Sequence, residues 1–202
     1  MKKIHFIVLV LLAYSSPSCK NTSDAKSTVD TQIIIDSVEV LKNELVLNQN
    51  EGNWYYEGQL FTGYSLKYHP NDTLAEKLCF YKGKREGVAK SWYPSGMLQV
   101  VLHYKQNRLH GSYKSWWDNG VLGSEAIYRK GKLSGVEKKW YSNGQLSKVR
   151  QLLNGKEEGL QKAWLKNGTL YVNYEAKNGR IFGMRRANSC YQLEDETVVQ
   201  SK

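Results

Sequence analysis

The sequence predicts an all-β fold, an elongated antiparallel ribbon of β-hairpins built from 24-residue units. The first observation is a fixed period, which indicates a repeat architecture. A glycine recurs every 24 residues, a large aromatic residue follows five positions later, and a leucine follows eleven positions later. The glycines are Gly63, Gly87, Gly111, Gly135, Gly159 and Gly183, the aromatic residues are Tyr68, Trp92, Trp116, Trp140 and Trp164, and the leucines are Leu74, Leu98, Leu122, Leu146 and Leu170.

Two turn signals in each unit are the second observation. One is Asn-Gly, as at Asn143-Gly144, and the other is a glycine near the end of the unit, as at Gly131. Asn-Gly between aromatic and β-branched runs favours a two-residue hairpin turn with φ > 0 at both central residues, so we expect that geometry there. Two turns leave two strands of about five to eight residues per unit, and no helix of ordinary length fits between them.

Alternating apolar residues in the second strand of the unit are the third observation. Leu98, Val100, Leu102 and Tyr104 are expected on one face, with Gln99, Val101 and His103 on the other. If the Trp column of stacked units forms the core, a second aromatic column lies on the opposite face, because adjacent strand residues point in opposite directions. An exposed aromatic row is a candidate binding surface, and its members are Tyr93, Trp117 and Tyr141.

The N-terminus carries a predicted targeting segment. Residues 1–18 have a basic start and an apolar run of eleven residues, which is too short to span a bilayer and typical of a secretory signal peptide. Cys19 follows a small residue, as in a bacterial lipobox, and is the predicted lipidation site; the alternative is ordinary cleavage after Ser18. The polar stretch 19–32 is a predicted flexible tether. We therefore expect a lipid-anchored protein of the bacterial cell envelope, in the outer membrane if the cell has two membranes.

Three further segments follow the tether. Residues 33–62 are expected to form an N-terminal capping segment, because the terminal units of a repeat array protect its open edges. Within it the sequence predicts a strand near Val38 and Val40, a short helical turn from Val40 to Leu45, and a hairpin from Glu44 to Glu57. Residues 63–191 hold five full units and a degenerate sixth, and residues 192–202 are a polar C-terminal tail.

The stretch from Gly135 to Leu146 reads as a glycine, a polar run, two aromatic residues, Asn-Gly and a leucine. This pattern resembles the MORN-repeat family, and most closely its bacterial lipoprotein variant, many members of which are labelled as antitoxin components of the YwqK type. The stretch from Asn53 to Gly63 also looks like the start of those proteins, so the resemblance covers residues 53–183. It implies a non-enzymatic scaffold that binds a protein partner, with antitoxin-like neutralisation as one version, and it implies no catalytic residue and no cofactor.

Basic residues recur with the same period as the glycines. The formal charge of +10 falls to +8 without Lys2 and Lys3. Two interpretations of the basic columns stay open: they attract an anionic glycan or lipid headgroups, or they keep a long β-surface soluble and guard its edges. Nucleic acid is not an expected partner of an exported chain. One column comprises Lys84, Arg108, Lys132, Lys156 and Arg180, and the other comprises Lys90, Lys114, Lys138 and Lys162.

Catalytic and metal-binding patterns are missing from the sequence. Beyond the signal segment the histidines are His69, His103 and His110, without the cysteine or carboxylate cluster that a metal site needs. A bridge between Cys79 and Cys190 is not expected, because more than four units place them about 40 Å apart along a ribbon. Cys79 is instead expected to be buried in the sheet. The sequence therefore predicts a binding protein without an active site.

Overall fold

The computed structural model describes Ile35 and residues 37–184 of the chain. The predictions for the signal peptide, Cys19, the tether, Cys190 and the C-terminal tail lie outside these residues. Within them the chain is almost all β-strand, with one short 3-10 turn, η1 (Lys42–Glu44). None of the described segments is a helix with the length and apolar character needed to cross a membrane.

Two β-sheets contain all the strands of the described residues. The larger has fourteen strands, and its central order from β5 to β17 follows the sequence. Its strands are β1 (Glu39–Leu41), β5 (Gly63–Tyr68), β6 (Leu74–Tyr81), β7 (Lys84–Arg85), β8 (Gly87–Trp92), β9 (Leu98–Lys105), β10 (Arg108–Trp116), β11 (Leu122–Arg129), β12 (Lys132–Leu133), β13 (Gly135–Trp140), β14 (Leu146–Leu153), β15 (Lys156–Trp164), β16 (Leu170–Lys177) and β17 (Arg180–Met184). The smaller sheet comprises β2 (Val46–Asn48), β3 (Asn53–Tyr56) and β4 (Gln59–Leu60).

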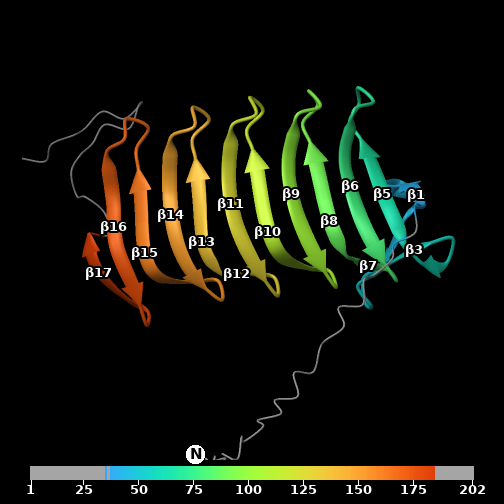
Figure 1. Ribbon diagram of the computed structural model, residues 1–202. Coiled ribbons are helices and arrows are strands. Elements are labelled where there is room, and N and C mark those ends of the chain that lie inside the picture. The colour runs from blue at the N-terminus through green and yellow to red at the C-terminus, as the bar shows by residue number, and fades with distance from the viewer. Residues whose placement is uncertain (1–34, 36, 185–202) are drawn as a thin grey trace, which may run out of the picture. The chain divides into compact units, whose positions relative to one another are not determined.

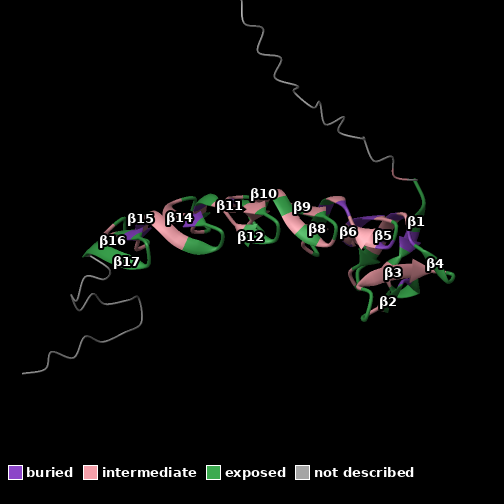
Figure 2. Ribbon diagram, turned by 90° about the horizontal axis from the view of Figure 1, so that it is seen from below, coloured by how far each residue is buried: buried purple, intermediate pink, exposed green. Residues whose placement is uncertain are grey.

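Each 24-residue unit contributes one antiparallel hairpin, which confirms the predicted fold class. The pairs within units are β5 with β6, β8 with β9, β10 with β11, β13 with β14, and β15 with β16. Figure 1 shows these hairpins side by side, with the turns within units along one edge of the sheet and the turns between units along the other. The sheet is a single layer beyond the strands that the small sheet covers (Figure 2).

The Asn-Gly turns differ from the prediction. At Asn143-Gly144 only Gly144 has a positive φ, of 86°. The N–H of Gly144 bonds the carbonyl of Tyr141, and the N–H of Tyr141 bonds the carbonyl of Gln145. This is a three-residue loop, a type I turn followed by a left-handed glycine. The Asn143 side chain accepts the N–H of Gln145 and so stabilises the loop.

Positive φ at both central residues occurs instead in the turns between units, as at Lys130 (51°) and Gly131 (82°). These are the two-residue turns that favour the twist of a β-hairpin. The predicted requirement for glycine was therefore right at Gly144, whereas the predicted conformation of the asparagine beside it was wrong.

A β-bulge in each hairpin shifts the side-chain alternation. In β8 and β9, Ser91 pairs with Val100, whereas Trp92 pairs with Leu98, so Gln99 is the extra residue. Because directly opposed residues share a face, Leu98 lies on the face opposite to Val100. The prediction of one common face was therefore wrong for Leu98, although it holds for Val100, Leu102 and Tyr104.

The pairing register assigns every strand residue of the large sheet to one of two faces. We call one the capped face, because the small sheet covers it at its N-terminal end. We call the other the Trp/Lys face. The capped face carries Ala89, Leu102, Tyr113, Ala126, Glu137, Arg150 and Gln161, and the Trp/Lys face carries the Trp column together with Lys90, Lys114, Lys138 and Lys162.

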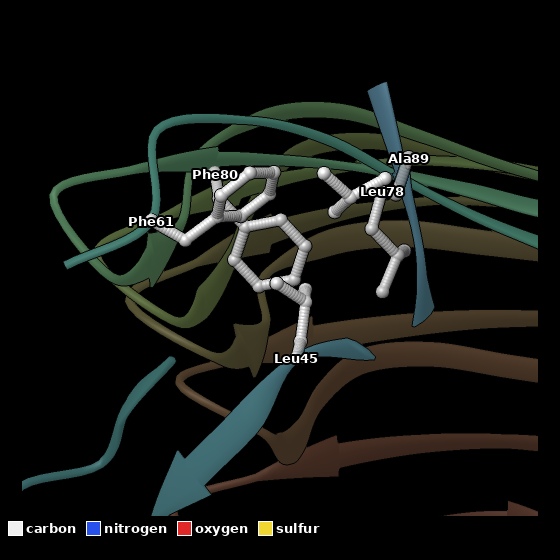
Figure 3. Packing of buried hydrophobic residues seen from close by; sticks show 6 residues of the cluster. Leu45, Phe61, Leu78, Phe80 and Ala89 are labelled. Carbon is white, nitrogen blue, oxygen red and sulfur yellow. The ribbon is translucent and has the colours of Figure 1, made fainter. Parts of the chain in front are cut away.

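The hydrophobic core lies between the small sheet and the first units of the large sheet. Phe80 is its most buried residue, 1% exposed, and it packs in tilted or edge contacts against Phe61 and Trp54. Figure 3 shows this cluster, in which Leu78, Phe80 and Ala89 come from the large sheet and Leu45 and Phe61 from segments that border the small sheet. The prediction that the Trp column forms the core was wrong, because Trp92 and its equivalents lie half-buried on the opposite face.

The N-terminal segment forms a cap whose main elements agree with the prediction. Residues 46–56 fold into the expected hairpin, β2 with β3, and η1 lies within the predicted helical turn. β1 pairs with β5 in parallel, with Val40 opposite Ser65, and this parallel pairing was not anticipated. Since β1 occupies the open side of β5, it protects the edge of the array at which the first unit begins.

Candidate binding face

Both predicted basic columns lie on the Trp/Lys face. The first column lies beside the turns between units. Its residues are strand partners of other basic residues there, as Arg108 is of Lys105 and Lys132 is of Arg129. The second column lies six residues further along the chain in each unit, as Lys114 does opposite Glu125. The pairing register therefore shows that both columns lie on one face of the sheet.

Most of these cations have no carboxylate partner. Among the nine column residues, Lys138 alone forms an ion pair within the described residues, with Glu125 at 3.3 Å between Nζ and Oε1. Both side chains of that pair are substantially exposed, so solvent screening leaves little net attraction. The face consequently presents regularly spaced positive charge that carboxylates of the described residues leave mostly unpaired.

Charged side chains on the capped face form ion pairs with one another. Glu137 is nearly buried, and its carboxylate accepts a 2.6 Å hydrogen bond from the Arg150 guanidinium, with Lys139 3.6 Å away. The hydrogen bond to Glu137 raises the pKa of Arg150, against the opposing effect of burial. Because these groups satisfy one another, the capped face offers less free charge than the Trp/Lys face.

Exposed apolar side chains interrupt the basic columns. Ile127 and Val136 are each 41% exposed, on neighbouring strands in the middle of the Trp/Lys face. The tryptophans lie toward the opposite edge, each opposite a leucine, as Trp140 is to Leu146. Trp and Arg are enriched in protein interfaces whereas Lys is depleted, so the Trp, Arg and aliphatic side chains of this face resemble an interface in composition and the lysine column does not. The other exposed aliphatic residues of this face include Val88 and Leu160.

The second aromatic column lies on the capped face and connects neighbouring units. Tyr93 donates its hydroxyl hydrogen to the carbonyl of Trp116 at 3.0 Å, and Tyr141 does the same to Trp164 at 2.8 Å. The Trp117 indole N–H bonds the carbonyl of Trp140 at 3.0 Å. His69 occupies the equivalent position in the first unit, with Nε2 2.9 Å from the carbonyl of Trp92. Hydrogen bonds between units therefore explain why an aromatic residue recurs at this position, and no ligand is needed to explain it.

Cys79 is buried in β6, as the sequence predicted, and it is a free thiol. Burial raises the pKa of this thiol, against a smaller opposing effect of a hydrogen bond with Tyr64. His103 places Nδ1 3.0 Å from the carbonyl of Ser112. Within the described residues no three His, Cys, Asp or Glu side chains gather as metal ligands would.

Sequence reasoning missed Arg129 and Lys130, which the structure places beside the basic column at the turn between β11 and β12. Together with Arg108, His110 and Lys132 they line a hollow of about 750 Å³. The signal was present as the run Arg-Lys-Gly-Lys at 129–132. It became informative only when the register placed Arg108 of the preceding turn next to it.

Comparison with known proteins supports the repeat assignment. Residues 85–106, 109–130 and 133–152 match the family model of the MORN repeat variant. No curated protein matches the chain. Among solved structures, the chain is similar to one described as the crystal structure of accessory secretory protein 1, 2 and 3 in Streptococcus pneumoniae, with 14% sequence identity and a TM-score of 0.29. That match covers 60% of this chain, which spans 21% of the matched chain.

Proposed function

We propose that this protein is a non-enzymatic repeat scaffold of the bacterial envelope that captures an acidic protein partner on its Trp/Lys face. The observation that carries the proposal is the gathering of both basic columns and the Trp column on one face. Of the nine column cations, only Lys138 has an ion-pair partner within the described residues. Complementary charge speeds encounter and selects the partner, whereas exposed apolar groups such as Ile127 and Val136 supply contact area.

Charge reversal on one face, compared with charge reversal on the other, tests this function. A triple variant, Lys90→Glu, Lys114→Glu and Lys162→Glu, should lose the partner that the wild-type protein captures from envelope extract. Lys148→Glu, a single reversal on the capped face, is compared with the single reversal Lys114→Glu on the Trp/Lys face, and Lys148→Glu should retain more capture. If the triple variant captures the same partner as wild type, the Trp/Lys face is not the binding surface.

Binding of an anionic glycan or of lipid headgroups is the second candidate function. It is favoured by the regular spacing of the cations, since successive residues of one column lie about 9–10 Å apart across two strands. Attraction of this kind weakens steeply with ionic strength, whereas binding through the apolar part of the face does not. Retention on an acidic polysaccharide or on anionic vesicles at low salt, with release at high salt, would favour this candidate over a protein partner.

Anchoring through Cys19 is part of the proposed function. An acylated N-terminus would tether the scaffold to the bilayer, and in the antitoxin-like version the partner is a toxin that acts in the envelope. Incorporation of a radiolabelled fatty acid should mark the wild-type protein and not the Cys19→Ala variant. Release of an unlabelled wild-type protein into the soluble fraction would exclude the anchor.

A further inference from the structure

One kind of hydrogen bond recurs at three of the turns between units. The acceptor is the side chain of the residue directly before the repeating glycine. The donor is the backbone N–H of the residue twenty positions later, which is the first residue of the next turn between units. Glu86 accepts the N–H of Gln106 at 2.8 Å, and Glu158 accepts that of Asn178 at 3.2 Å. In the first unit the Thr62 hydroxyl oxygen accepts the N–H of Lys82 at 2.9 Å. This position therefore normally supplies an oxygen acceptor, and twice that acceptor is a carboxylate.

The middle units break this rule. His110 and Ser134 occupy the position, and among the described residues neither Lys130 nor Asn154 has an acceptor for its N–H. A turn amide without an acceptor is an available donor, and an incoming oxygen would satisfy it. At His110 the place taken by a carboxylate in two other units is consequently left open.

The surroundings of Lys130 are strongly cationic. Arg108, Arg129, Lys130 and Lys132 line the hollow of about 750 Å³, together with His110 and without a carboxylate among the lining residues. None of the four cations forms an ion pair within the described residues. Guanidinium groups bind carboxylates in a bidentate manner, and a backbone N–H adds a directed donor.

We propose that this hollow is a carboxylate-binding site for an acidic segment of the partner protein. A glutamate or aspartate of that segment would bond the Lys130 N–H as Glu86 bonds that of Gln106, between the two arginines. This inference rests on the proposed function and specifies where the partner engages the Trp/Lys face. Ile127 also lines the hollow and is 41% exposed, so it offers an apolar contact beside the charge, which favours a protein segment over a glycan.

The test uses the full-length ¹⁵N-labelled protein and a hexaglutamate peptide as the probe. On titration the amide signal of Lys130 should move downfield and saturate. The amides of Gln106 and Asn178 should stay in place, because carboxylates of the protein already bond them. A Lys130 signal that does not move overturns the proposal.

His110→Glu is the decisive variant, because it installs the residue found at Glu86 and Glu158. Its carboxylate should occupy the hollow. Hexaglutamate binding should then weaken at least about tenfold, because one carboxylate of the peptide loses its charge-assisted hydrogen bonds. Thr62→Glu adds one negative charge at the equivalent position two units earlier, beside Lys82, which does not line the hollow. It should leave binding within about twofold, since screened charges at that separation interact weakly. Equal weakening by both variants would show that net charge, and not this site, governs binding.

A hexagalacturonate of equal charge distinguishes the ligand class. Weaker binding than hexaglutamate supports a protein segment, and tighter binding overturns that assignment in favour of a glycan. Failure here is separable from failure of the proposed function. If the face variants abolish partner capture while the Lys130 amide does not respond, only the carboxylate site is excluded.

Discussion

At the scale of single residues, the backbone conformation at a glycine, and not the space around it, decides whether another residue can replace it. Gly144 needs its left-handed φ of 86°, and a Cβ there would meet only the Val121 side chain, at 3.8 Å. The constraint is therefore the backbone and not space. Gly123 is the extra residue of a bulge and has no positive φ, and a Cβ there would approach Ser115 and Trp117 at 3.4 Å. Substitution of these two glycines, which lie in neighbouring units, should therefore affect stability differently.

Gly144→Val should destabilise the protein by about 1–3 kcal/mol, because a β-branched residue is strained at positive φ. Gly123→Ala should be neutral or stabilise by up to about 1 kcal/mol, because it restricts the unfolded chain. Thermal melts of both variants beside wild type make the comparison. A Gly144→Val protein that melts like wild type, beside a Gly123→Ala protein that collapses, would contradict the turn geometry.

Tyr141→Phe removes the hydrogen bond from the tyrosine hydroxyl to the carbonyl of Trp164. It should destabilise the protein by about 0.5–1.5 kcal/mol, because the carbonyl loses its partner while the ring stays packed. Tyr68→Phe is the matched control, because Tyr68 is 45% exposed and its hydroxyl has no partner in the described part of the chain. Urea denaturation should show a lower midpoint for Tyr141→Phe alone. Equal midpoints would mean that the inter-unit bond contributes nothing to stability.

At the scale of elements, the cap and the repeat hairpins bury apolar surface unequally. The strands β6 and β8 place Leu78, Phe80 and Ala89 against the small sheet. Later strands bury mainly small residues, such as Ala126, Ala163 and Ala176. Since hydrophobic stabilisation scales with buried apolar area, the strands under the cap hold a larger share of the stability than equivalent strands of later units.

Phe80→Ala should therefore destabilise the protein by about 3–5 kcal/mol, the range for removing a buried phenylalanine. Phe182→Ala is the control at the far end of the array. Phe182 is 54% exposed and lies on the Trp/Lys face, opposite Glu175. Its effect should stay within about 0.5 kcal/mol, as for other surface substitutions. Denaturant unfolding with both variants decides the matter. Similar losses from both substitutions would disprove a core located at the cap.

At the scale of the whole described unit, stability should fall along the array. A repeat protein is stabilised by the sum of its units and of their nearest-neighbour contacts, so an unequal distribution of core produces a gradient. Among the described residues the large sheet is capped at β5, and β17 is its last strand. A partner bound at the middle units would engage a part of the sheet that the cap does not cover.

Native-state hydrogen exchange should reveal this gradient. Amides of β6, β8 and β9 should exchange only through global opening, whereas those of β16 and β17 should exchange through local opening that costs less free energy. Residue-resolved exchange at neutral pH measures both sets in one sample. Uniform protection from β6 to β17 would show that the array unfolds as one cooperative unit.

The sequence by itself determined the repeat and its period, because a 24-residue spacing of glycine, aromatic residue and leucine is visible without coordinates. It also determined that Gly144 adopts a positive φ and that Cys79 is buried, since both follow from local chemistry. These properties depend on a residue and its near neighbours in the chain. They required no knowledge of which unit lies beside which.

Only the tertiary structure decided which residues share a face. One bulge in each hairpin reversed Leu98 relative to Val100, and a bulge is set by strand register, which residue spacing does not reveal. The location of the core depended on a separate small sheet packing on one end of the array. The hollow at Lys130 likewise exists because two turns from different units lie side by side and His110 lacks the carboxylate of Glu86. Contacts between distant parts of the chain determine these features, and a single sequence does not specify them.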